Sequence, residues 1–162
     1  MSKRSIPASF FVFTIVPHQG RFLAVRERKG NQGWYAPAGR LEAGETIAEA
    51  AIRETMEEAG ILVQPFALLR LEQQWFPPEQ VEAGPSAWLR FVLMARPVGR
   101  SLVPKTFADR HSLEARWVTL GELARLPLRH SEVLELFAQS SRSAPELDLT
   151  QVDLLTSARL AD

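Results

Sequence analysis

The chain has 162 residues, of which 46% are hydrophobic, and this suits a single domain with one buried core. Its 19 Lys and Arg residues balance its 19 Asp and Glu residues, so it lacks the basic excess typical of proteins that bind a nucleic-acid polymer. It contains no cysteine, which excludes disulfides, thiolate nucleophiles and cysteine-ligated metal centres.

The N-terminal region contains an apolar stretch, residues 10–16, that follows Lys3 and Arg4. This stretch is short and runs into a turn signal at residues 17–20, without the small-residue cleavage pattern of a secretory signal. No later segment approaches the length needed to span a membrane. We therefore expect a soluble cytoplasmic protein with no membrane partner.

The first third of the chain is typical of short strands separated by turns. Residues 10–16 and 21–27 are rich in β-forming residues and flank the turn signal, so we expect them to form a β-hairpin. A loop follows at residues 29–33, then a short extended piece at 34–37 and a glycine-bounded loop at 39–44.

Residues 47–59 carry the clearest helix signal. Thr46 is a suitable N-cap, Glu49 completes a capping box with it, and Gly60 supplies a left-handed C-cap. An apolar stripe at helical spacing should pack on a sheet. Its members are Ala48, Ile52, Thr55, Met56 and Ala59.

The remainder of the chain continues this mixture of strands and helices. We expect one or two strands in residues 61–76, further strands at 88–98 and 115–120, and short helices at 121–126 and 131–139. A proline-rich loop covers residues 77–86. The pattern predicts an α/β layered fold. We place one domain at residues 1–140 and a tail at 141–162 that packs on the domain or stays mobile.

Three glutamates, Glu54, Glu57 and Glu58, share one face of the predicted helix. A solvated helix face is the ordinary interpretation, but two costs oppose it. Glu54 and Glu58 are like charges four residues apart, which destabilise a helix by roughly 0.2–0.5 kcal/mol. Glu57 and Glu58 lie near the helix C-terminus, where the macrodipole disfavours anions by roughly 0.3–1 kcal/mol each. A hard cation such as Mg²⁺ or Mn²⁺ would relieve both costs.

The segment around these glutamates carries a longer motif. Residues 39–61 read GRLEAGETIAEAAIRETMEEAGI and match the Nudix box, G-x(5)-E-x(7)-R-E-U-x-E-E-x-G-U, where U is a bulky aliphatic residue. Thr55 replaces the first U residue. The chain thus resembles the Nudix hydrolase superfamily, which implies an α/β/α sandwich with a mixed central β-sheet. The seven fixed positions that match are Gly39, Glu45, Arg53, Glu54, Glu57, Glu58 and Gly60.

This resemblance implies a metal site on the helix. Glu54, Glu57 and Glu58 would hold Mg²⁺, for which Mn²⁺ could substitute, together with the carbonyl oxygen of Ala38. Where many family members have Gly-Gly, this chain has Ala38-Gly39, which leaves that carbonyl in place. The implied reaction is attack of water at phosphorus in a nucleoside diphosphate linked to another moiety.

The resemblance also assigns catalytic and supporting roles. Glu54, Glu57 and Arg53 form the implied catalytic set, with Glu57 either a further metal ligand or the group that activates water. Arg53 would act chiefly by orientation, through an ion pair with Glu45. Gly39, Glu45 and Gly60 would support the box structurally.

Residues 34–46, which include the start of the box, resemble the oxidised-guanine nucleoside diphosphatases, the motif-18 branch of the superfamily, and so do residues 88–99, 108–109, 113–118 and 126–130. The similarity extends over residues 10–137 and implies conversion of 8-oxo-guanine nucleoside diphosphates to monophosphates. Alternative substrates are nucleoside triphosphates, nucleotide sugars and ADP-ribose. A different class of function is a non-catalytic Nudix sensor that binds nucleotides, but the complete set of carboxylates favours a hydrolase.

Several residues outside the box are candidates for binding a small nucleotide. Three cations around the box loop, Arg28, Lys29 and Arg40, could contact phosphates, although solvated surface cations are the ordinary interpretation. Trp75 and Phe76 could stack on a base, although core packing fits both equally well, and we expect Trp88 in the core.

The sequence leaves other assignments open. We assign no role to the three histidines, and we expect either a monomer or a homodimer. A further acidic residue from outside the box could assist, and the candidates are Glu79, Glu82, Asp109 and Glu114.

Overall fold

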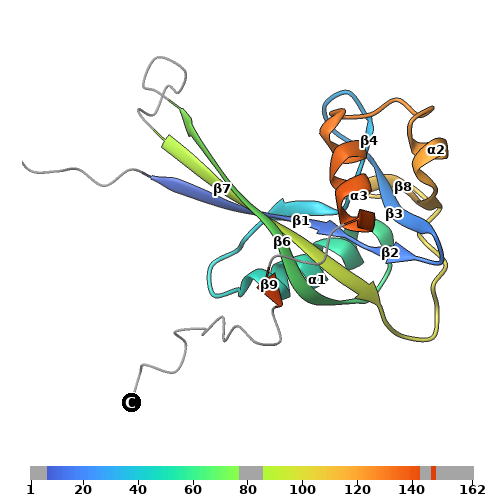
Figure 1. Ribbon diagram of the computed structural model, residues 1–162, viewed down its shortest axis with the longest axis horizontal. Coiled ribbons are helices and arrows are strands. Elements are labelled where there is room, and N and C mark those ends of the chain that lie inside the picture. The colour runs from blue at the N-terminus through green and yellow to red at the C-terminus, as the bar shows by residue number, and fades with distance from the viewer. Residues whose placement is uncertain (1–6, 77–85, 143–146, 149–162) are drawn as a thin grey trace, which may run out of the picture.

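The computed structural model of the chain describes residues 7–76, 86–142 and 147–148 (Figure 1). Its elements, in chain order, are β1 (Ala8–Ile15), β2 (Pro17–His18), β3 (Arg21–Glu27), β4 (Trp34–Tyr35), β5 (Ala38–Arg40), α1 (Ile47–Ala59), β6 (Val63–Phe76), β7 (Ser86–Pro97), β8 (Ser112–Val118), α2 (Leu120–Leu123), α3 (Glu132–Arg142) and β9 (Leu147–Asp148).

Two sheets organise the described part of the chain. The larger has the strand order β5-β1-β7-β6-β9, and it is mixed because β1 pairs parallel with β7 and antiparallel with β5. In the smaller sheet, β3 pairs with β2, β4 and β8. The predicted α/β fold with a mixed sheet is therefore confirmed.

Helices cover both faces of β1. Phe13 and Ile15 are fully buried in a cluster that includes Phe137 of α3. Val12, on the opposite face, is buried with Ala50 and Ala51 of α1. Because successive side chains of a strand alternate between faces, this continuous apolar run is what a strand covered on both sides requires.

Helix α1 begins and ends where the sequence predicts. The Thr46 hydroxyl accepts a hydrogen bond from Glu49 N at 3.0 Å, and the Glu49 carboxylate accepts one from Thr46 N at 2.8 Å. Gly60 ends the helix in the left-handed conformation at φ 70°. This element confirms the predicted capping box and C-cap.

The buried face of α1 differs from the predicted stripe. Met56 is 42% exposed and Ala48 is only partly buried, while the buried residues are Ala50, Ala51, Thr55 and Ala59. Small side chains let the helix lie close to the sheet, which turns Met56 outward. The same rotation carries Glu54 and Glu58 towards the sheet.

The predicted hairpin is wrong for its first strand. The turn at Gln19 and Gly20 joins β2 to β3, and both residues have positive φ, 47° and 72°. β1 instead pairs with β5 and β7 in the other sheet. Its residues need cover on both faces, which a two-stranded hairpin does not supply.

Strands β6 and β7 form a long antiparallel pair that reaches past both α1 and α3 (Figure 1). The predicted loop at 77–86, with its candidates Glu79 and Glu82, lies almost wholly outside the described residues. α3 runs through the expected domain boundary at residue 140 to Arg142, and β9 pairs with β6 at Ala67 and Leu68. Residues 143–146 and 149–162 of the tail lie outside the described part. No described helix is long and apolar enough to cross a membrane.

Candidate active site

Glu54 packs directly against β5. A Cβ atom added to Gly39 would lie 1.9 Å from Glu54 Oε1, so the carboxylate occupies the space that any other residue would fill. The position of Gly39 is set by its register with Val12 of β1. The Glu54 side chain is only 13% exposed, and this burial raises the pKa of the Glu54 carboxyl.

Glu58 is held one turn further along α1. Its Oε2 accepts a hydrogen bond from Ala38 N at 3.0 Å. Burial raises the pKa of the Glu58 carboxyl to about 8, with the neighbouring Glu54 adding to the rise and the Ala38 hydrogen bond opposing it. Two partly desolvated carboxylates therefore face the same short strand, where a cation would favour the charged form of both.

Arg53 connects the box loop to the helix. Its Nε and Nη2 bind Glu45 Oε1 and Oε2 at 2.5 and 2.9 Å, and Nη2 also donates to Arg40 O at 2.9 Å. The predicted ion pair between Arg53 and Glu45 is therefore present. Arg53 Nη1 also donates to Glu54 Oε1 at 2.9 Å, which fixes the orientation of that carboxylate.

Glu57 faces outward from the other two glutamates and is 31% exposed. Its Oε2 lies 3.5 Å from Arg53 Nη1 and 3.2 Å from His111 Nδ1. His111, for which the sequence suggests no role, thus contacts a box carboxylate. Of the acidic candidates outside the box, Asp109 binds Lys105 Nζ at 2.8 Å, and Glu114 pairs with Arg26 and Arg116.

The C-terminus of α1 is closed by two polar side chains. Lys105 is 8% exposed, and its Nζ donates to Glu57 O at 2.8 Å. Ser112 Oγ donates to Glu58 O at 2.7 Å. The ammonium group offsets part of the electrostatic cost of placing acidic residues at this end of a helix.

The donor atoms of the box suit a hard divalent cation. Glu54 and Glu58 supply carboxylate oxygens beside Gly39 and Ala38, and Glu58 forms no ion pair with any residue that the structure describes. Among the described residues, no three carboxylate or imidazole side chains converge closely enough to enclose an ion, because Glu54 and Glu57 are turned towards Arg53. The site thus has suitable oxygens, which do not converge on one point in this structure.

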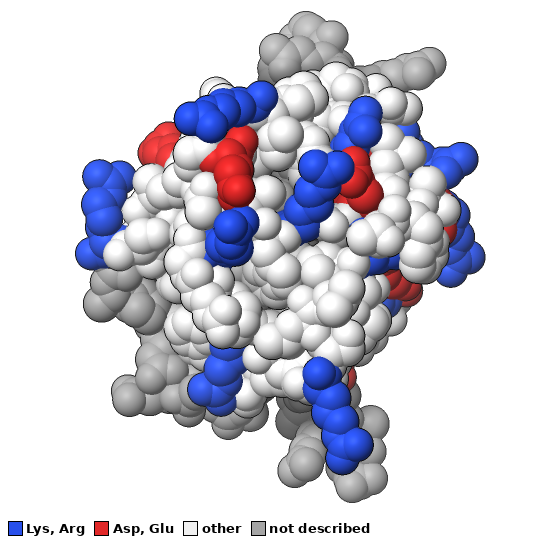
Figure 2. Space-filling view, turned by 90° about the vertical axis from the view of Figure 1, so that its right-hand side faces the viewer, with Lys and Arg blue, Asp and Glu red and all other residues white. Residues whose placement is uncertain are grey.

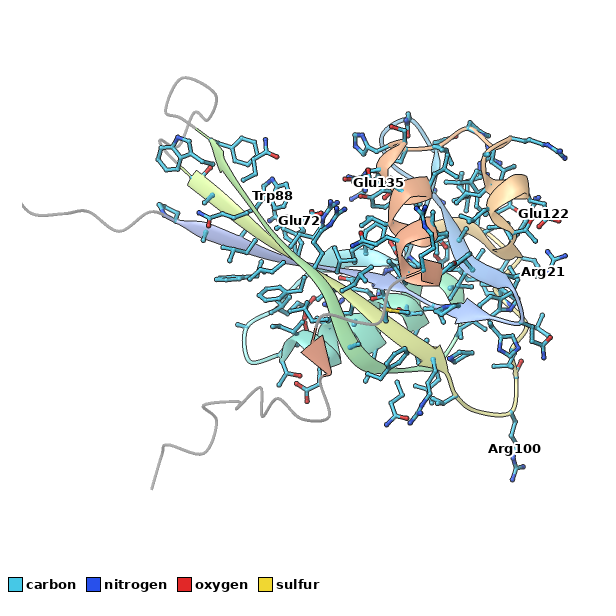
Figure 3. All side chains as sticks on the ribbon, viewed as in Figure 1. Arg21, Glu72, Trp88, Arg100, Glu122 and Glu135 are labelled. Atoms are coloured by element: carbon cyan, nitrogen blue, oxygen red, sulfur yellow. The ribbon has the colours of Figure 1, made fainter. Side chains whose placement is uncertain are left out.

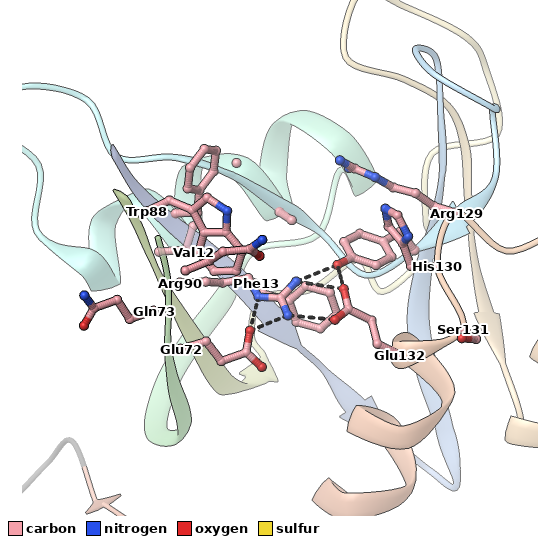
Figure 4. Close-up of a pocket in the computed structure, with 15 residues that line it drawn as sticks. Val12, Phe13, Glu72, Gln73, Trp88, Arg90, Arg129, His130, Ser131 and Glu132 are labelled. Carbon is pink, nitrogen blue, oxygen red and sulfur yellow. Dashed lines mark hydrogen bonds and ion pairs between the residues drawn. The ribbon is translucent and has the colours of Figure 1, made fainter. Parts of the chain in front are cut away.

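A cavity of about 910 Å³ lies beside these carboxylates, on the α3 side of the larger sheet (Figure 4). Ala38 and Gly39 form one part of its lining, so the two residues that contact Glu58 and Glu54 also border the cavity. Phe11 and Trp88 supply aromatic walls, with their rings 6.4 Å apart and edge to face.

Arg90 lies at the centre of a charged network in this cavity (Figure 4). It donates to Glu72 Oε2 at 2.6 Å, to Glu132 Oε2 at 2.9 Å and to the Tyr35 hydroxyl at 2.8 Å. Hydrogen bonding from Arg90 lowers the pKa of Glu132 to about 2, and burial raises the pKa of Tyr35. Glu132 and Arg90 therefore remain an ion pair at neutral pH, and the network ties the start of α3 to β6 and β7.

The tryptophans are placed differently from the sequence-based expectation. Trp88 lines the 910 Å³ cavity, whereas Trp75 is 47% exposed, and neither Trp75 nor Phe76 borders this cavity. The alternation of side chains along a strand could have predicted this position. Trp88 lies two residues from Arg90, so both side chains are on the same face of the sheet. Figure 3 shows Trp88 and Glu72 on the long strands, close to the sheet face on which α3 packs.

The two predicted phosphate-binding arginines lie apart. Arg40 has its guanidinium 5.3 Å from the Phe11 ring centroid, at the edge of the first cavity. Arg28 lines a second cavity of about 600 Å³ that also contains Glu58. Arg129 and His130 border both cavities, so the two are adjacent.

Comparison with known proteins identifies relatives of this chain. The model of the NUDIX domain matches residues 6–137. The 8-oxo-dGDP phosphatase NUDT18 of Homo sapiens is 46% identical over 113 residues, which are 70% of this chain but only 31% of that protein. The Phosphatase NudJ of Shigella boydii is 36% identical over 115 residues, 70% of each chain.

Solved structures show the same fold. A NUDIX hydrolase from Nitrosomonas europaea superimposes with a TM-score of 0.67 and 22% identity, covering 92% of this chain and 96% of that one. The match to the NUDIX domain model covers most of the chain and includes all the box residues described above. The chain is therefore a member of the Nudix hydrolase family.

Proposed function

We propose that the protein is a Mg²⁺-dependent hydrolase that converts 8-oxo-guanine nucleoside diphosphates to monophosphates. The main observation behind the proposal is that the box carboxylates and the 910 Å³ cavity share a border. Ala38 and Gly39 contact Glu58 and Glu54 on one side and line the 910 Å³ cavity on the other. A nucleotide in that cavity would present its phosphates to the box carboxylates. The similarity to an 8-oxo-dGDP phosphatase supports the choice of base.

The box residues would have separate roles in metal binding, water activation and orientation. Glu54, Glu57 and Glu58 would hold the ion with the Ala38 carbonyl, and a bound divalent ion would neutralise the diphosphate charge and acidify water. Glu57, which is more exposed than Glu54, is suited to accept the proton of the attacking water. Arg53 would keep Glu54 and Glu57 oriented through the contacts it makes with both.

The cavity accounts for binding of the nucleoside. Phe11 and Trp88 offer aromatic surfaces on which a purine would stack, and the Arg90 network supplies charged atoms in the same cavity. Figure 2 shows the side of the molecule that bears α2, where basic side chains are scattered and several of them lie beside acidic ones. That side shows no continuous basic stripe of the kind that a polymeric nucleic acid would require.

Conservative substitutions in the box test the hydrolase. Glu54→Gln and Glu58→Gln should each reduce Mg²⁺-dependent turnover by at least 100-fold in a phosphate-release assay, while circular dichroism remains that of the folded protein. Glu135→Gln on α3 is a matched control, because its side chain is 71% exposed and lies outside both cavities. Full activity of either box variant would contradict the assignment.

A substrate panel tests the choice of base. We expect kcat/KM with Mg²⁺ to be highest for 8-oxo-dGDP among 8-oxo-dGDP, 8-oxo-dGTP, dGTP and ADP-ribose. Preference for ADP-ribose would refute the oxidised-guanine proposal and leave the hydrolase intact. Binding without turnover of any of the four would favour the alternative of a nucleotide sensor.

A further inference from the structure

The second cavity is built from three loops that converge on Glu58. They precede β4, β8 and α3, and together they enclose about 600 Å³. The cavity is basic although the chain as a whole has no net charge. Its charged and imidazole side chains are Glu27, Arg28, Lys29, Glu58, Arg110, His111, Arg129 and His130.

Three of these cations have no carboxylate partner in the described part of the chain. Among the residues that the structure describes, Arg28, Lys29 and Arg110 form no ion pair with a carboxylate, whereas Arg129 is paired with Glu27. Arg28 donates to a backbone oxygen, that of Asp109, at 2.9 Å. Arg110 Nε contacts His111 Nε2 at 2.8 Å. Like charges gathered around one cavity repel each other, and an anion placed among them would remove that cost.

The position of the cavity indicates which part of a substrate it would receive. Arg129 and His130 border both cavities, and Glu58 borders the second. A nucleotide with its base in the first cavity and its phosphates beside the box carboxylates would therefore direct the far end of its phosphate chain into the second cavity. An unesterified terminal phosphate carries two negative charges there, whereas an esterified one carries a single charge and a bulky neutral group.

We propose that the second cavity is a subsite for an unesterified terminal phosphate, formed by Arg28, Lys29 and Arg110. It selects nucleoside diphosphates and triphosphates over nucleotide sugars and ADP-ribose. This inference rests on the proposed function, because the orientation of the nucleotide in the two cavities follows from that function. The side chains that distinguish these substrates would then lie outside the box motif.

Binding without divalent metal tests the subsite separately from catalysis. Titration calorimetry in the presence of a chelator would compare the Kd of 8-oxo-dGDP with that of 8-oxo-dGMP, which lacks the terminal phosphate. We expect the wild type to bind the diphosphate at least tenfold more tightly. Lys29→Gln and Arg110→Gln should each reduce this ratio by about tenfold, as the loss of one charge-assisted contact predicts.

The control is an exposed arginine away from the cavities. Arg100 is exposed, borders neither cavity and points away from the body of the molecule in Figure 3. Arg100→Gln should leave the ratio unchanged, which separates local contacts from general electrostatic attraction. Lys29, Arg100 and Arg110 are all exposed, so the three variants should remain folded.

Two results would overturn the proposal. One is a wild type that binds the diphosphate no more tightly than the monophosphate, including no measurable binding of either. The other is an unchanged ratio in both Lys29→Gln and Arg110→Gln. Equal affinity for dGDP and 8-oxo-dGDP would instead count against the oxidised-guanine proposal, since both nucleotides have the same terminal phosphate.

Discussion

At the scale of single residues, Gly39 is the position where the backbone of β5 and the carboxylate of Glu54 compete for space. The atoms that a Cβ at Gly39 would meet are the tip of the Glu54 side chain, at 1.9–2.4 Å. The Glu54 carboxylate can move away at little cost to stability, but it then no longer lies against β5. We therefore predict that Gly39→Ala lowers kcat by at least 100-fold while the free energy of unfolding changes by less than about 1 kcal/mol.

Gly121→Ala provides the comparison for this substitution. A Cβ at Gly121 meets no atom within 4 Å, and the residue lies in α2, where Ala is favoured over Gly by about 1 kcal/mol. Activity of this variant should equal that of the wild type. If Gly39→Ala kept its activity, or lost it only by unfolding in a urea titration, the proposed placement of Glu54 would be incorrect.

Glu58 links the site to pH. Its pKa is about 8 in the folded, metal-free protein, whereas the ordinary carboxyl value is 4.5. Between these values the folded protein binds the additional proton, so its stability falls as pH rises. We predict that metal-free wild type loses roughly 2–4 kcal/mol from pH 5 to pH 8, at about 1.36 kcal/mol for each pKa unit.

Urea unfolding with a chelator at several pH values would measure this slope. Glu58→Gln removes the titrating group and should flatten the profile, while the exposed Glu135→Gln should not. A wild-type stability that rises steadily from pH 5 to pH 8 would show that Glu58 ionises normally in the folded protein.

At the scale of elements, the box helix is the part of the fold that the sequence predicts best. Caps act through contacts three or four residues apart, so Thr46, Glu49 and Gly60 determine its ends locally. The sequence predicts less well which face of the helix packs on the sheet. Large apolar residues are usually buried, but here the helix lies close to the sheet and small residues face it. Met56 was misplaced for that reason.

The walls of the cavity show a second limit of sequence reasoning. Whether a strand residue faces a cavity or solvent depends on what covers that face, and α3, which lies more than 40 residues after Trp88, sets this. Trp75 and Trp88 are both aromatic residues in long strands, so composition alone does not separate them. Period-two alternation with Arg90 would have placed Trp88 correctly had Arg90 been recognised as a cavity residue.

The C-terminus of α1 depends on Lys105, whose ammonium group lies between Glu57 O and the Asp109 carboxylate. The lysine side chain is 5% exposed and holds the pKa of Asp109 well below its usual range. Lys105→Met would leave both acceptors without this partner. We predict a loss of roughly 2–3 kcal/mol in the free energy of unfolding, measured by urea denaturation at neutral pH.

Lys29→Met is the matched comparison, because Lys29 is exposed and forms no ion pair within the described residues. Its stability should stay within about 0.5 kcal/mol of wild type. Similar losses in the two variants would mean that the buried ammonium contributes no more than an exposed one.

At the scale of the whole molecule, the site depends on pairings that join distant parts of the chain. β1 pairs parallel with β7, and β5 reaches the site only because it pairs with the other edge of β1. Such long-range pairings leave no local signature, so the hairpin predicted for residues 10–27 was the natural error. The box motif still identified the family, because its residues act within one loop and one helix.

This arrangement makes metal binding a property of the entire fold. An ion held by Glu54, Glu58 and the Ala38 carbonyl would connect α1 to β5, and an unfolded chain does not bring these groups together, so binding should stabilise the folded state. We predict that Mg²⁺ at 100 times its Kd raises the stability of wild type by about 2.7 kcal/mol at pH 8, measured as a shift in Tm.

The shift should also depend on protonation and on the box. At pH 5 the Glu58 carboxyl is protonated, so the same Mg²⁺ concentration should give a smaller shift, and Glu58→Gln should give little shift at either pH. Glu135→Gln, outside the site, should respond as wild type does. An equal shift in wild type and Glu58→Gln would place the ion elsewhere. The pH dependence then identifies the carboxylate through which metal binding is coupled to folding.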